Sequence, residues 1–232
     1  MLSLPSTSSE ELEDFHCKIV LVGDCKCGKT ALIHQFVNEE FLQVYAPTIF
    51  ERYSVTYQVT NYRVHCTIWD TSGTPGYDTV RPLAYPETHV FILCFTISDP
   101  TTLENIVTKW YPEVRRYCQT TPLILCGCQS DLRNDCETLS KLAEIQRIPV
   151  SAEQGVAVSR QIGATTYVET SSKTCPKAIQ DAFEVSALAA LGKLNKSLSS
   201  NQKFSSNRYN GTWHRAKVDL NFRDRTKNCV VM

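Results

Sequence analysis

The chain of 232 residues has no long hydrophobic run, and this absence excludes several classes of protein. Its longest apolar stretch, VFILCF at residues 90–95, is far shorter than the roughly 20 residues that a membrane-spanning helix needs. Residues 1–14 are polar and acidic, so we expect no secretory signal there. No internal repeat is present, which excludes the repeat architectures.

A regular cysteine framework is also missing. The eleven cysteines have no regular spacing, and several lie inside strand-like runs. An odd number without a framework argues for reduced thiols in the cytosol rather than for a disulfide-stabilised secreted domain. Cys126 and Cys128 are close in sequence, but no matching Cys or His pair accompanies them. We therefore expect no metal site built on cysteine.

Net charge is absent too, because 24 basic residues balance 24 acidic ones. The balance hides an asymmetry: residues 193–232 carry nine Lys and Arg but only two acids, Asp219 and Asp224, so the preceding body is acidic. Such a tail is predicted to meet a negatively charged surface, a membrane or a nucleic acid, and the alternative is a merely soluble tail. Its Ser- and Asn-rich composition predicts disorder.

The body alternates strand-length apolar runs with helical periodicity, which is typical of an α/β fold with a mostly parallel sheet. Strands are expected at residues 17–22, 53–59, 62–70, 90–97, 122–127 and 165–170. Helices are expected near residues 30–37, 101–117, 153–162 and 176–190, with an additional helical segment at 139–147. We divide the chain into a flexible extension (1–16), a globular domain (17–191) and a disordered basic tail (192–232).

Residues 23–30, GDCKCGKT, match the phosphate-binding pattern G-x-x-x-x-G-K-[ST] between a predicted strand and a predicted helix. Glycines let the backbone N–H groups face phosphate oxygens at the helix N-terminus. Lys29 would bring a positive charge to the β- and γ-phosphates, and the Thr30 hydroxyl would ligate Mg²⁺. The sequence therefore predicts a nucleotide site whose loop consists of Asp24, Cys25, Lys26, Cys27, Gly28, Lys29 and Thr30.

Together with this loop, further segments resemble the small GTPases of the Ras superfamily, and the Rho family more closely. YAPTIFERY (residues 45–53) is similar to the first Rho switch, WDTSG (69–73) to the second switch, and RPLAYP (81–86) follows the Rho pattern. The resemblance covers about residues 18–191. It implies a P-loop NTPase small G domain, with a mixed, mostly parallel six-stranded sheet flanked by helices and a Rho-type insert helix at 139–147.

The resemblance also implies roles for the switch residues. Thr48 would close on Mg²⁺ and the γ-phosphate, and Asp70 would hold Mg²⁺ through a water molecule. The Gly73 N–H would reach the γ-phosphate. Phe41 would stack edgewise on guanine, and Tyr45 belongs to the same nucleotide-binding set. The implied cofactors are GTP and Mg²⁺.

In the family, an Asn-Lys-x-Asp stretch recognises guanine, and the matching residues here are CQSD, 128–131. Asp131 is kept and offers two charge-assisted hydrogen bonds to the base, whereas Cys128 and Gln129 replace Asn and Lys. TSSK (residues 170–173) is similar to the last family motif, which would place Ser171, Ser172 and Lys173 around the base. We expect guanine to be preferred over adenine, with weaker binding than in standard members.

The stretch WDTSGTPGYD, residues 69–78, departs from the family where hydrolysis is promoted. In the family a Gln orients the attacking water, and an Arg from an activating protein neutralises the developing charge. Thr74 stands at the Gln position, Pro75 stiffens the loop, and Cys25 replaces a P-loop glycine. We predict no intact catalytic set and very slow or absent hydrolysis. The alternative is that the Thr74 hydroxyl, or a residue elsewhere, positions the water.

This combination resembles the Rnd subfamily of Rho proteins, which stay GTP-bound, although Rnd members usually keep the Lys that Gln129 replaces. The implied function is signalling through effectors that bind the switch regions, with Rho GTPase-activating proteins and plexins among the implied partners and Rho signalling and the actin cytoskeleton as the outcome. A conventional cycling Rho GTPase is the alternative. A P-loop kinase is disfavoured because no lid or second-substrate motif is present. We expect a monomer and no nucleic-acid binding.

The chain ends in CVVM, residues 229–232, a C-a-a-X box whose terminal Met favours farnesylation of Cys229. One lipid chain holds a protein only marginally on a membrane, so the basic tail is expected to add electrostatic attraction. We therefore expect dynamic attachment to the cytoplasmic face of the cell membrane, with a cytosolic pool.

Overall fold

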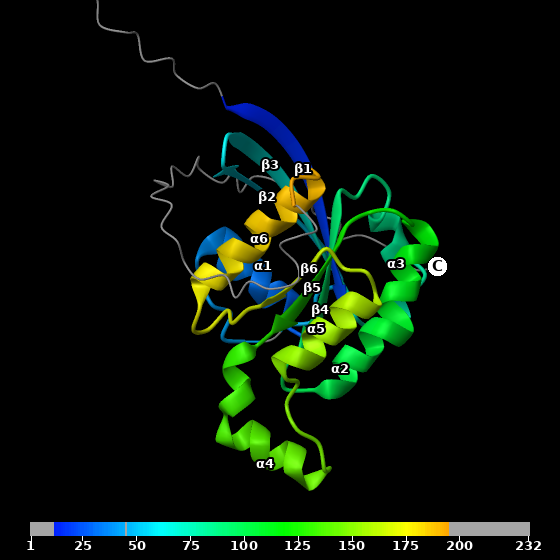
Figure 1. Ribbon diagram of the computed structural model, residues 1–232, viewed down its shortest axis with the longest axis vertical. Helices are drawn as coiled ribbons and strands as arrows, with labels where there is room; N and C mark the ends of the chain where they lie inside the picture. The colour runs from blue at the N-terminus through cyan, green and yellow to red at the C-terminus, as the bar shows by residue number, and fades with distance from the viewer. Residues whose placement is uncertain (1–11, 45, 195–232) are drawn as a thin grey trace, which may run out of the picture.

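A six-stranded sheet organises the computed structural model, which describes residues 12–44 and 46–194 (Figure 1). The strands are β1 (Glu13–Gly23), β2 (Phe50–Val59), β3 (Tyr62–Thr71), β4 (Val90–Thr96), β5 (Leu123–Cys128) and β6 (Thr166–Glu169). Their order across the sheet is β2-β3-β1-β4-β5-β6. Only the β2–β3 hairpin is antiparallel among these neighbouring pairs. The predicted mixed, mostly parallel six-stranded sheet is confirmed.

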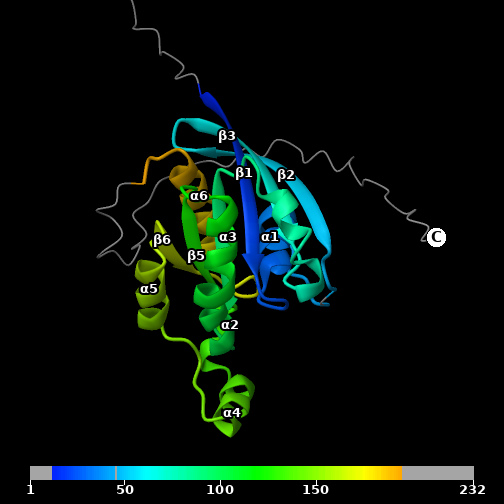
Figure 2. The same cartoon turned by 90° about the vertical axis from the view of Figure 1, so that its right-hand side faces the viewer.

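Helices cover both faces of this sheet (Figures 1 and 2). The helices on one face are α1 (Lys29–Asn38) and α6 (Pro176–Ala190). Those on the other face are α2 (Pro100–Asn105), α3 (Tyr111–Tyr117) and α5 (Ala152–Gln161). A π-helical segment, Ile106–Trp110, joins α2 to α3, so the single helix predicted near 101–117 is continuous. Helix α4 (Cys136–Glu144) projects from one end of the domain in both views and corresponds to the predicted insert helix.

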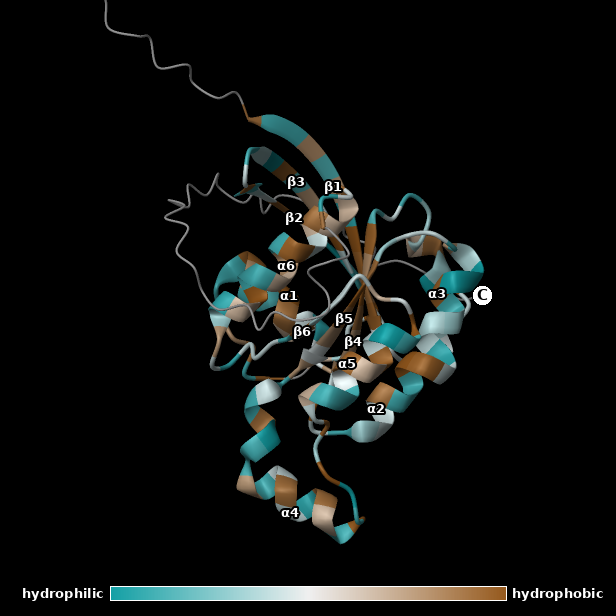
Figure 3. Cartoon of the chain, in the orientation of Figure 1, coloured by the Kyte–Doolittle hydropathy of each residue, from teal (hydrophilic) through white to brown (hydrophobic). Residues whose placement is uncertain are grey.

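The core is divided into two apolar layers by the sheet. Under α1 and α6, the rings of Phe36 and Phe183 stack with 3.9 Å between their centroids. On the opposite face, Trp110 of the π-helical segment is fully buried in a cluster that includes apolar side chains of β1, β4 and β5. Strands β4 and β5 are buried along their whole length, as central parallel strands are, and Figure 3 shows the apolar strands between helices with polar outer faces.

The first strand begins earlier than predicted. β1 starts at Glu13 rather than Cys17, because residues 13–16 pair with β3 in parallel register, from Glu13 opposite Tyr62 to His16 opposite His65. The extension predicted for residues 1–16 is therefore wrong for residues 13–16. Residues 1–11 and the tail from residue 195 onward lie outside the described part of the chain. Within the described ranges, no helix combines the length and apolar character that crossing a membrane requires.

The parallel strands bring the predicted motifs to one edge of the sheet. β1 ends at Gly23, where the P-loop begins, and β3 ends at Thr71, just before the second switch. β5 ends at Cys128, at the start of the base motif, and β6 ends just before the TSSK segment. Because the carboxyl ends of parallel strands meet at the same edge, four segments far apart in sequence gather there.

Candidate nucleotide-binding site

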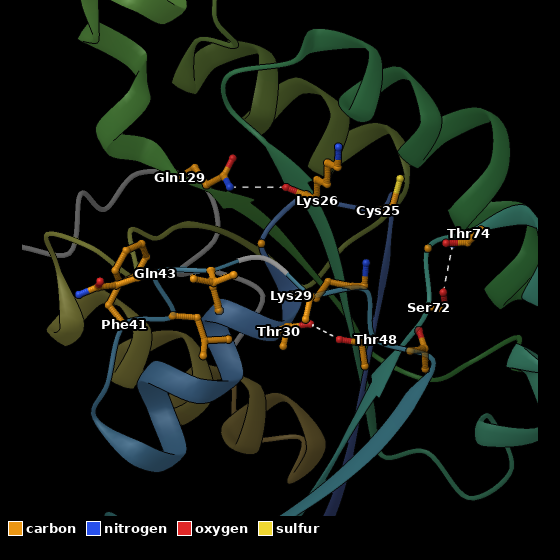
Figure 4. A pocket seen from close by; sticks show the side chains of 17 residues that line it. Cys25, Lys26, Lys29, Thr30, Phe41, Gln43, Thr48, Ser72, Thr74 and Gln129 are labelled. Carbon is orange, nitrogen blue, oxygen red and sulfur yellow. Dashed lines mark hydrogen bonds between the residues drawn. The ribbon is translucent and has the colours of Figure 1, made fainter. Parts of the chain in front are cut away.

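A cavity of about 200 Å³ opens at this edge of the sheet. Four segments line it: the P-loop with the start of α1, the stretch before β2, the second switch and the base motif (Figure 4). The lining residues are Cys25, Lys26, Gly28, Lys29, Thr30, Ala31, Phe41, Leu42, Gln43, Val44, Ala46, Thr48, Thr71, Ser72, Gly73, Thr74 and Gln129. Phe41 and Gln129 lie toward one end of the cavity, and Thr74 lies at the other.

The P-loop directs the N-terminus of α1 toward the cavity. Gly28 precedes the helix with a φ of 105°, a left-handed conformation that favours glycine. Lys29 is almost fully buried, and its Nζ donates hydrogen bonds to the carbonyls of Gly23 (2.9 Å) and Asp24 (2.8 Å). Burial opposes the charge on Lys29, but electrostatic interactions with Cys27 first and then with Asp70 outweigh burial and raise its pKa. A fixed positive charge beside helix N–H groups is the environment that a phosphate requires.

Three oxygen-bearing side chains meet where the sequence predicted the metal. The Thr30 hydroxyl donates a 2.6 Å hydrogen bond to Oδ2 of Asp70, and it lies 2.8 Å from the Thr48 hydroxyl. Asp70 is fully buried, and its Oδ1 has no hydrogen-bond partner within the described ranges. Burial also raises the pKa of Asp70. A buried carboxylate oxygen without a partner, next to two hydroxyls, fits the hard oxygen donors that Mg²⁺ prefers.

The second switch packs directly against the P-loop. A Cβ added to Gly73 would lie 2.3 Å from the backbone nitrogen of Cys25 and 2.4 Å from the carbonyl oxygen of Gly23. No side chain fits in that space, so glycine alone allows the two backbones to approach so closely. This contact sets the Gly73 backbone beside the predicted phosphate loop.

A buried arginine, to which the sequence analysis gave no role, anchors the second switch. Nε of Arg81 donates to the carbonyl of Ser72 (2.7 Å), and its Nη2 donates to the carbonyl of Thr74 (3.3 Å). The side chain of Arg81 is fully buried and forms ion pairs with Glu113 of α3 (2.7 Å) and with Asp78 (2.6 Å). A buried guanidinium requires charged partners of this kind. The burial of Arg81 and its pairing with Glu113 become visible only in the folded chain.

Two of the predicted P-loop residues point away from the cavity. The Asp24 carboxylate accepts hydrogen bonds from Nδ2 of Asn105 (2.7 Å) and from Nε1 of Trp110 (3.0 Å), so it faces the α2–α3 segment. The Cys27 side chain is fully buried. Only their backbone groups are available to a nucleotide. Cys25, in contrast, is exposed and lines the cavity.

Apart from Gln129, the residues predicted to surround the base lie beside the cavity rather than in its lining. Oγ of Ser171 donates a 2.6 Å hydrogen bond to Asp131, and the Ser130 N–H donates to the Thr170 carbonyl at 3.0 Å. These bonds join the two loops that were predicted to surround guanine. Ser172 and Lys173 follow in the second of these loops, and Lys173 is exposed.

Gln129, at the position of the family lysine, bridges to the P-loop. Its Oε1 accepts a 2.6 Å hydrogen bond from the Thr96 hydroxyl, and its Nε2 lies 3.5 Å from the Lys26 carbonyl (Figure 4). The amide therefore spans the end of the cavity without carrying charge. Of the remaining predicted residues, Tyr45 and Cys229 lie outside the described ranges.

Comparisons with known proteins agree with this geometry. The Ras family profile matches residues 18–191 of the chain. The Rho-related GTP-binding protein RhoE of human is 40% identical over 226 residues, which cover 95% of this chain and 92% of the relative. RhoE of mouse and of pig show the same identity and coverage. The small G domain and the resemblance to Rho proteins of the Rnd type are confirmed.

The buried carboxylate predicts opposite effects on stability and on ligand binding. Because burial raises the pKa of Asp70, its charged form is disfavoured in the folded state, and its contribution becomes less favourable as the pH rises above the unfolded pKa. Asp70→Asn should therefore melt at a higher temperature than wild type at pH 7 without nucleotide and Mg²⁺, and the difference should vanish in acid. Scanning calorimetry measures both.

With saturating GTP and Mg²⁺ the order should reverse, because only the wild type gains the full stabilisation from bound ligand. Asp181→Asn on α6, which changes a carboxylate far from the cavity, is the matched control and should gain as much as wild type. An Asp70→Asn variant that gains as much as wild type would rule out a metal role for this carboxylate.

Restoring a cation at the base motif should strengthen nucleotide binding. In Gln129→Lys, the ammonium can donate to the Lys26 carbonyl as a charge-assisted bond, and we expect about tenfold tighter GTP binding. Displacement of a fluorescent guanine nucleotide by unlabelled GTP measures the affinity. Displacement by ATP, which carries adenine instead of guanine, measures the preference for the base. Gln58→Lys on β2 adds the same charge elsewhere and should have no effect. Equal displacement by ATP and GTP would refute the guanine preference.

Proposed function

The chain belongs to the Ras family as a Rho-related GTP-binding protein, and we propose that it holds GTP with Mg²⁺ and hydrolyses it very slowly or not at all. Guanine nucleotide binding and Rho-family signalling follow from the family. Mg²⁺ would be held by Thr30, Thr48 and, through water, Asp70, and it would shield the charge of the phosphates. Persistent GTP binding would make this protein constitutively active, rather than a switch that turns itself off by hydrolysis.

The observation that carries this proposal is that Thr74, with its short side chain and anchored backbone, stands where the family has a glutamine. Its side chain is shorter than glutamine and has no amide with which to orient a water. Its carbonyl accepts from Arg81, and its N–H donates to the Ser72 hydroxyl at 3.3 Å, while Pro75 begins a 3₁₀ turn directly after it. The backbone is thus held from both sides, which hinders the loop from bringing another group to the same place.

The rate acceleration that the chain would lose is large. Assistance by an arginine finger raises the rate by roughly 10³ to 10⁵ in such enzymes. This corresponds to about 4–7 kcal/mol of the barrier. The exposed Cys25 side chain in the P-loop adds bulk where that arginine would enter. Loss of both contributions leaves binding intact and removes most of the acceleration.

Neither glutamine that lines the cavity is placed to replace the missing one. Gln129 lies at the far end from Thr74 and is bonded to Thr96. Gln43 lies near Phe41, also away from Thr74 (Figure 4). Neither glutamine can therefore take over the role of the missing one from its position in the structure.

Exposed apolar side chains beside both switches support binding of effectors there. Val44, Ile49 and Phe50 are exposed around the first switch, and Val80 and Leu83 are exposed after the second. Exposed apolar side chains next to the switches are available to a protein partner there. Effectors and regulators are general partners of Rho-family proteins. Rho GTPase-activating proteins and plexins, with an output to the actin cytoskeleton, are our specific proposal, as is a monomeric state.

Membrane attachment is proposed from the C-terminal sequence. Cys229 in the CVVM box would carry a farnesyl group, and the basic tail would supplement it by about 1 kcal/mol per residue near an anionic surface. Asp219 and Asp224 interrupt the basic residues, so we propose a dynamic equilibrium between the cytoplasmic face of the cell membrane and the cytosol.

The hydrolysis test uses purified protein loaded with GTP and follows GDP by chromatography. Wild type should convert GTP more slowly than the intrinsic rate of Ras, roughly 3–5 × 10⁻⁴ s⁻¹, and a Rho GTPase-activating protein should accelerate it less than about tenfold. The double variant Cys25→Gly/Thr74→Gln should regain at least about tenfold acceleration. Thr120→Gln, an exposed loop change, is the control. Wild-type protein that empties its GTP within minutes would establish the cycling alternative instead.

The membrane test compares fractionation of the full-length protein in cells. Cys229→Ser should move the protein to the cytosol, because a single lipid provides most of the marginal affinity. Cys175→Ser removes another exposed cysteine and should leave the distribution unchanged. A high-salt wash should release part of the wild-type protein, because the basic tail acts electrostatically. Unchanged fractionation of Cys229→Ser would contradict the anchor.

A further inference from the structure

Three buried cysteines meet beneath the nucleotide-binding loops. Cys94 of β4 lies directly opposite Cys126 of β5 in the parallel register, and Cys128 is two residues farther along, on the same face of β5. The three sulfur atoms all lie within 4.8 Å of one another, and those of Cys126 and Cys128 are 3.8 Å apart. In the sequence, no matching Cys or His pair accompanies Cys126 and Cys128. The pairing of β4 with β5 brings Cys94 beside them as a third possible ligand.

The spacing of these sulfurs matches that around one metal ion. Sulfur ligands lie about 2.3 Å from a thiolate-bound ion such as zinc. Three sulfurs at that distance in a plane are about 4 Å apart. The three cysteines are almost completely buried, so the cluster lies in a dry environment. No sulfur lies more than 4.8 Å from another, so the separations are within about 1 Å of those in a closed trigonal site.

The surroundings provide charge compensation and one further weak ligand. Lys29 of the P-loop is close enough for its ammonium to interact electrostatically with Cys94 and Cys128. Oγ1 of Thr170 lies 3.5 Å from the Cys126 sulfur. A buried anionic cluster requires a compensating cation, and the Lys29 ammonium can serve as one.

We propose that Cys94, Cys126 and Cys128 bind one soft, thiophilic metal ion, of the class to which Cu(I) and Zn(II) belong. Thiolates select soft ions over Mg²⁺ and Ca²⁺. Each thiol that ligates the ion releases its proton to solvent, and no oxidation or reduction takes place. Three ligands match Cu(I) geometrically, whereas Zn(II) favours four and would recruit a water or Thr170.

Burial of the site affects how it is loaded. Cys128 is only 3% exposed, and a Cβ at Gly28 of the P-loop would lie 3.1 Å from its Cβ, so the P-loop covers the cluster. An ion would therefore enter as the chain folds or during local opening. The test must include protein refolded in the presence of the ion.

The experiment uses the full chain, reduced and anaerobic, refolded with one equivalent of Cu(I) or Zn(II). Competition with a chromophoric chelator should show one tight equivalent, and X-ray absorption should show three sulfurs around the ion. The Cu(I) and Zn(II) arms decide which ion binds more tightly. Cys126→Val and Cys128→Asn should weaken binding by at least about 100-fold. The matched control is Cys66→Ala. Cys66 is a buried cysteine of β3 that lies opposite Cys17 of β1, and the variant should bind the ion like wild type.

Three results would overturn the proposal. One is the absence of a tight equivalent in wild type, and another is unchanged binding in Cys126→Val, which would place the ion on exposed cysteines. The third is a Cys126–Cys128 disulfide in freshly purified protein, found as a 2 Da loss on that peptide (about two hydrogens). If a variant fails to fold, a chain with the exposed Cys25, Cys136 and Cys175 changed to Ser decides, because it should keep the tight equivalent and the three-sulfur signal only if the buried cluster binds the ion.

Discussion

The parallel pairing of β1 with β3 is the constraint on which the nucleotide site depends. Its register sets Leu21 opposite Asp70, and the Thr71 hydroxyl donates to the Leu21 carbonyl at 2.6 Å. This brings the end of β3 beside the P-loop that follows β1. The Thr30 hydroxyl can then reach the Asp70 carboxylate, and Gly73 can pack against the backbone of Cys25. A slip of one residue would turn Asp70 to the opposite face of the sheet and separate these groups.

The residues proposed to bind phosphate and Mg²⁺ and the position at which hydrolysis would be promoted lie on different parts of the fold. Lys29 and Thr30 begin α1, and Asp70 is the penultimate residue of β3, so all three are held by regular secondary structure. Thr74 lies in the loop beyond β3. Substitutions in such a loop change the chemistry without disturbing the sheet. This separation would let the chain keep the proposed phosphate and metal site while losing the group that orients water.

The sequence predicted the sheet, the order of the helices and the phosphate loop because these depend on local pattern and spacing. Thr30, Thr48 and Asp70 were predicted to act together, and the structure brings them into contact. The Arg81 anchor and the cysteine cluster could not be predicted in this way. Arg81 finds Glu113 more than thirty residues away, and Cys94 meets Cys126 only through strand register. The early start of β1 was missed because residues 13–16 are mostly polar and gain their order from pairing with β3.

The buried Arg81 has a consequence for how the protein is controlled. Its bonds to the Ser72 and Thr74 carbonyls, supported by Glu113, hold the second switch to α3 through groups that touch no nucleotide. Breaking a buried ion pair of this kind costs about 3–5 kcal/mol, so the loop is resistant to rearrangement. Together with very slow hydrolysis, this anchoring would present one held shape of the loop to a partner for as long as GTP stays bound. The strength of the signal would then follow how many copies the cell makes and how quickly it removes them.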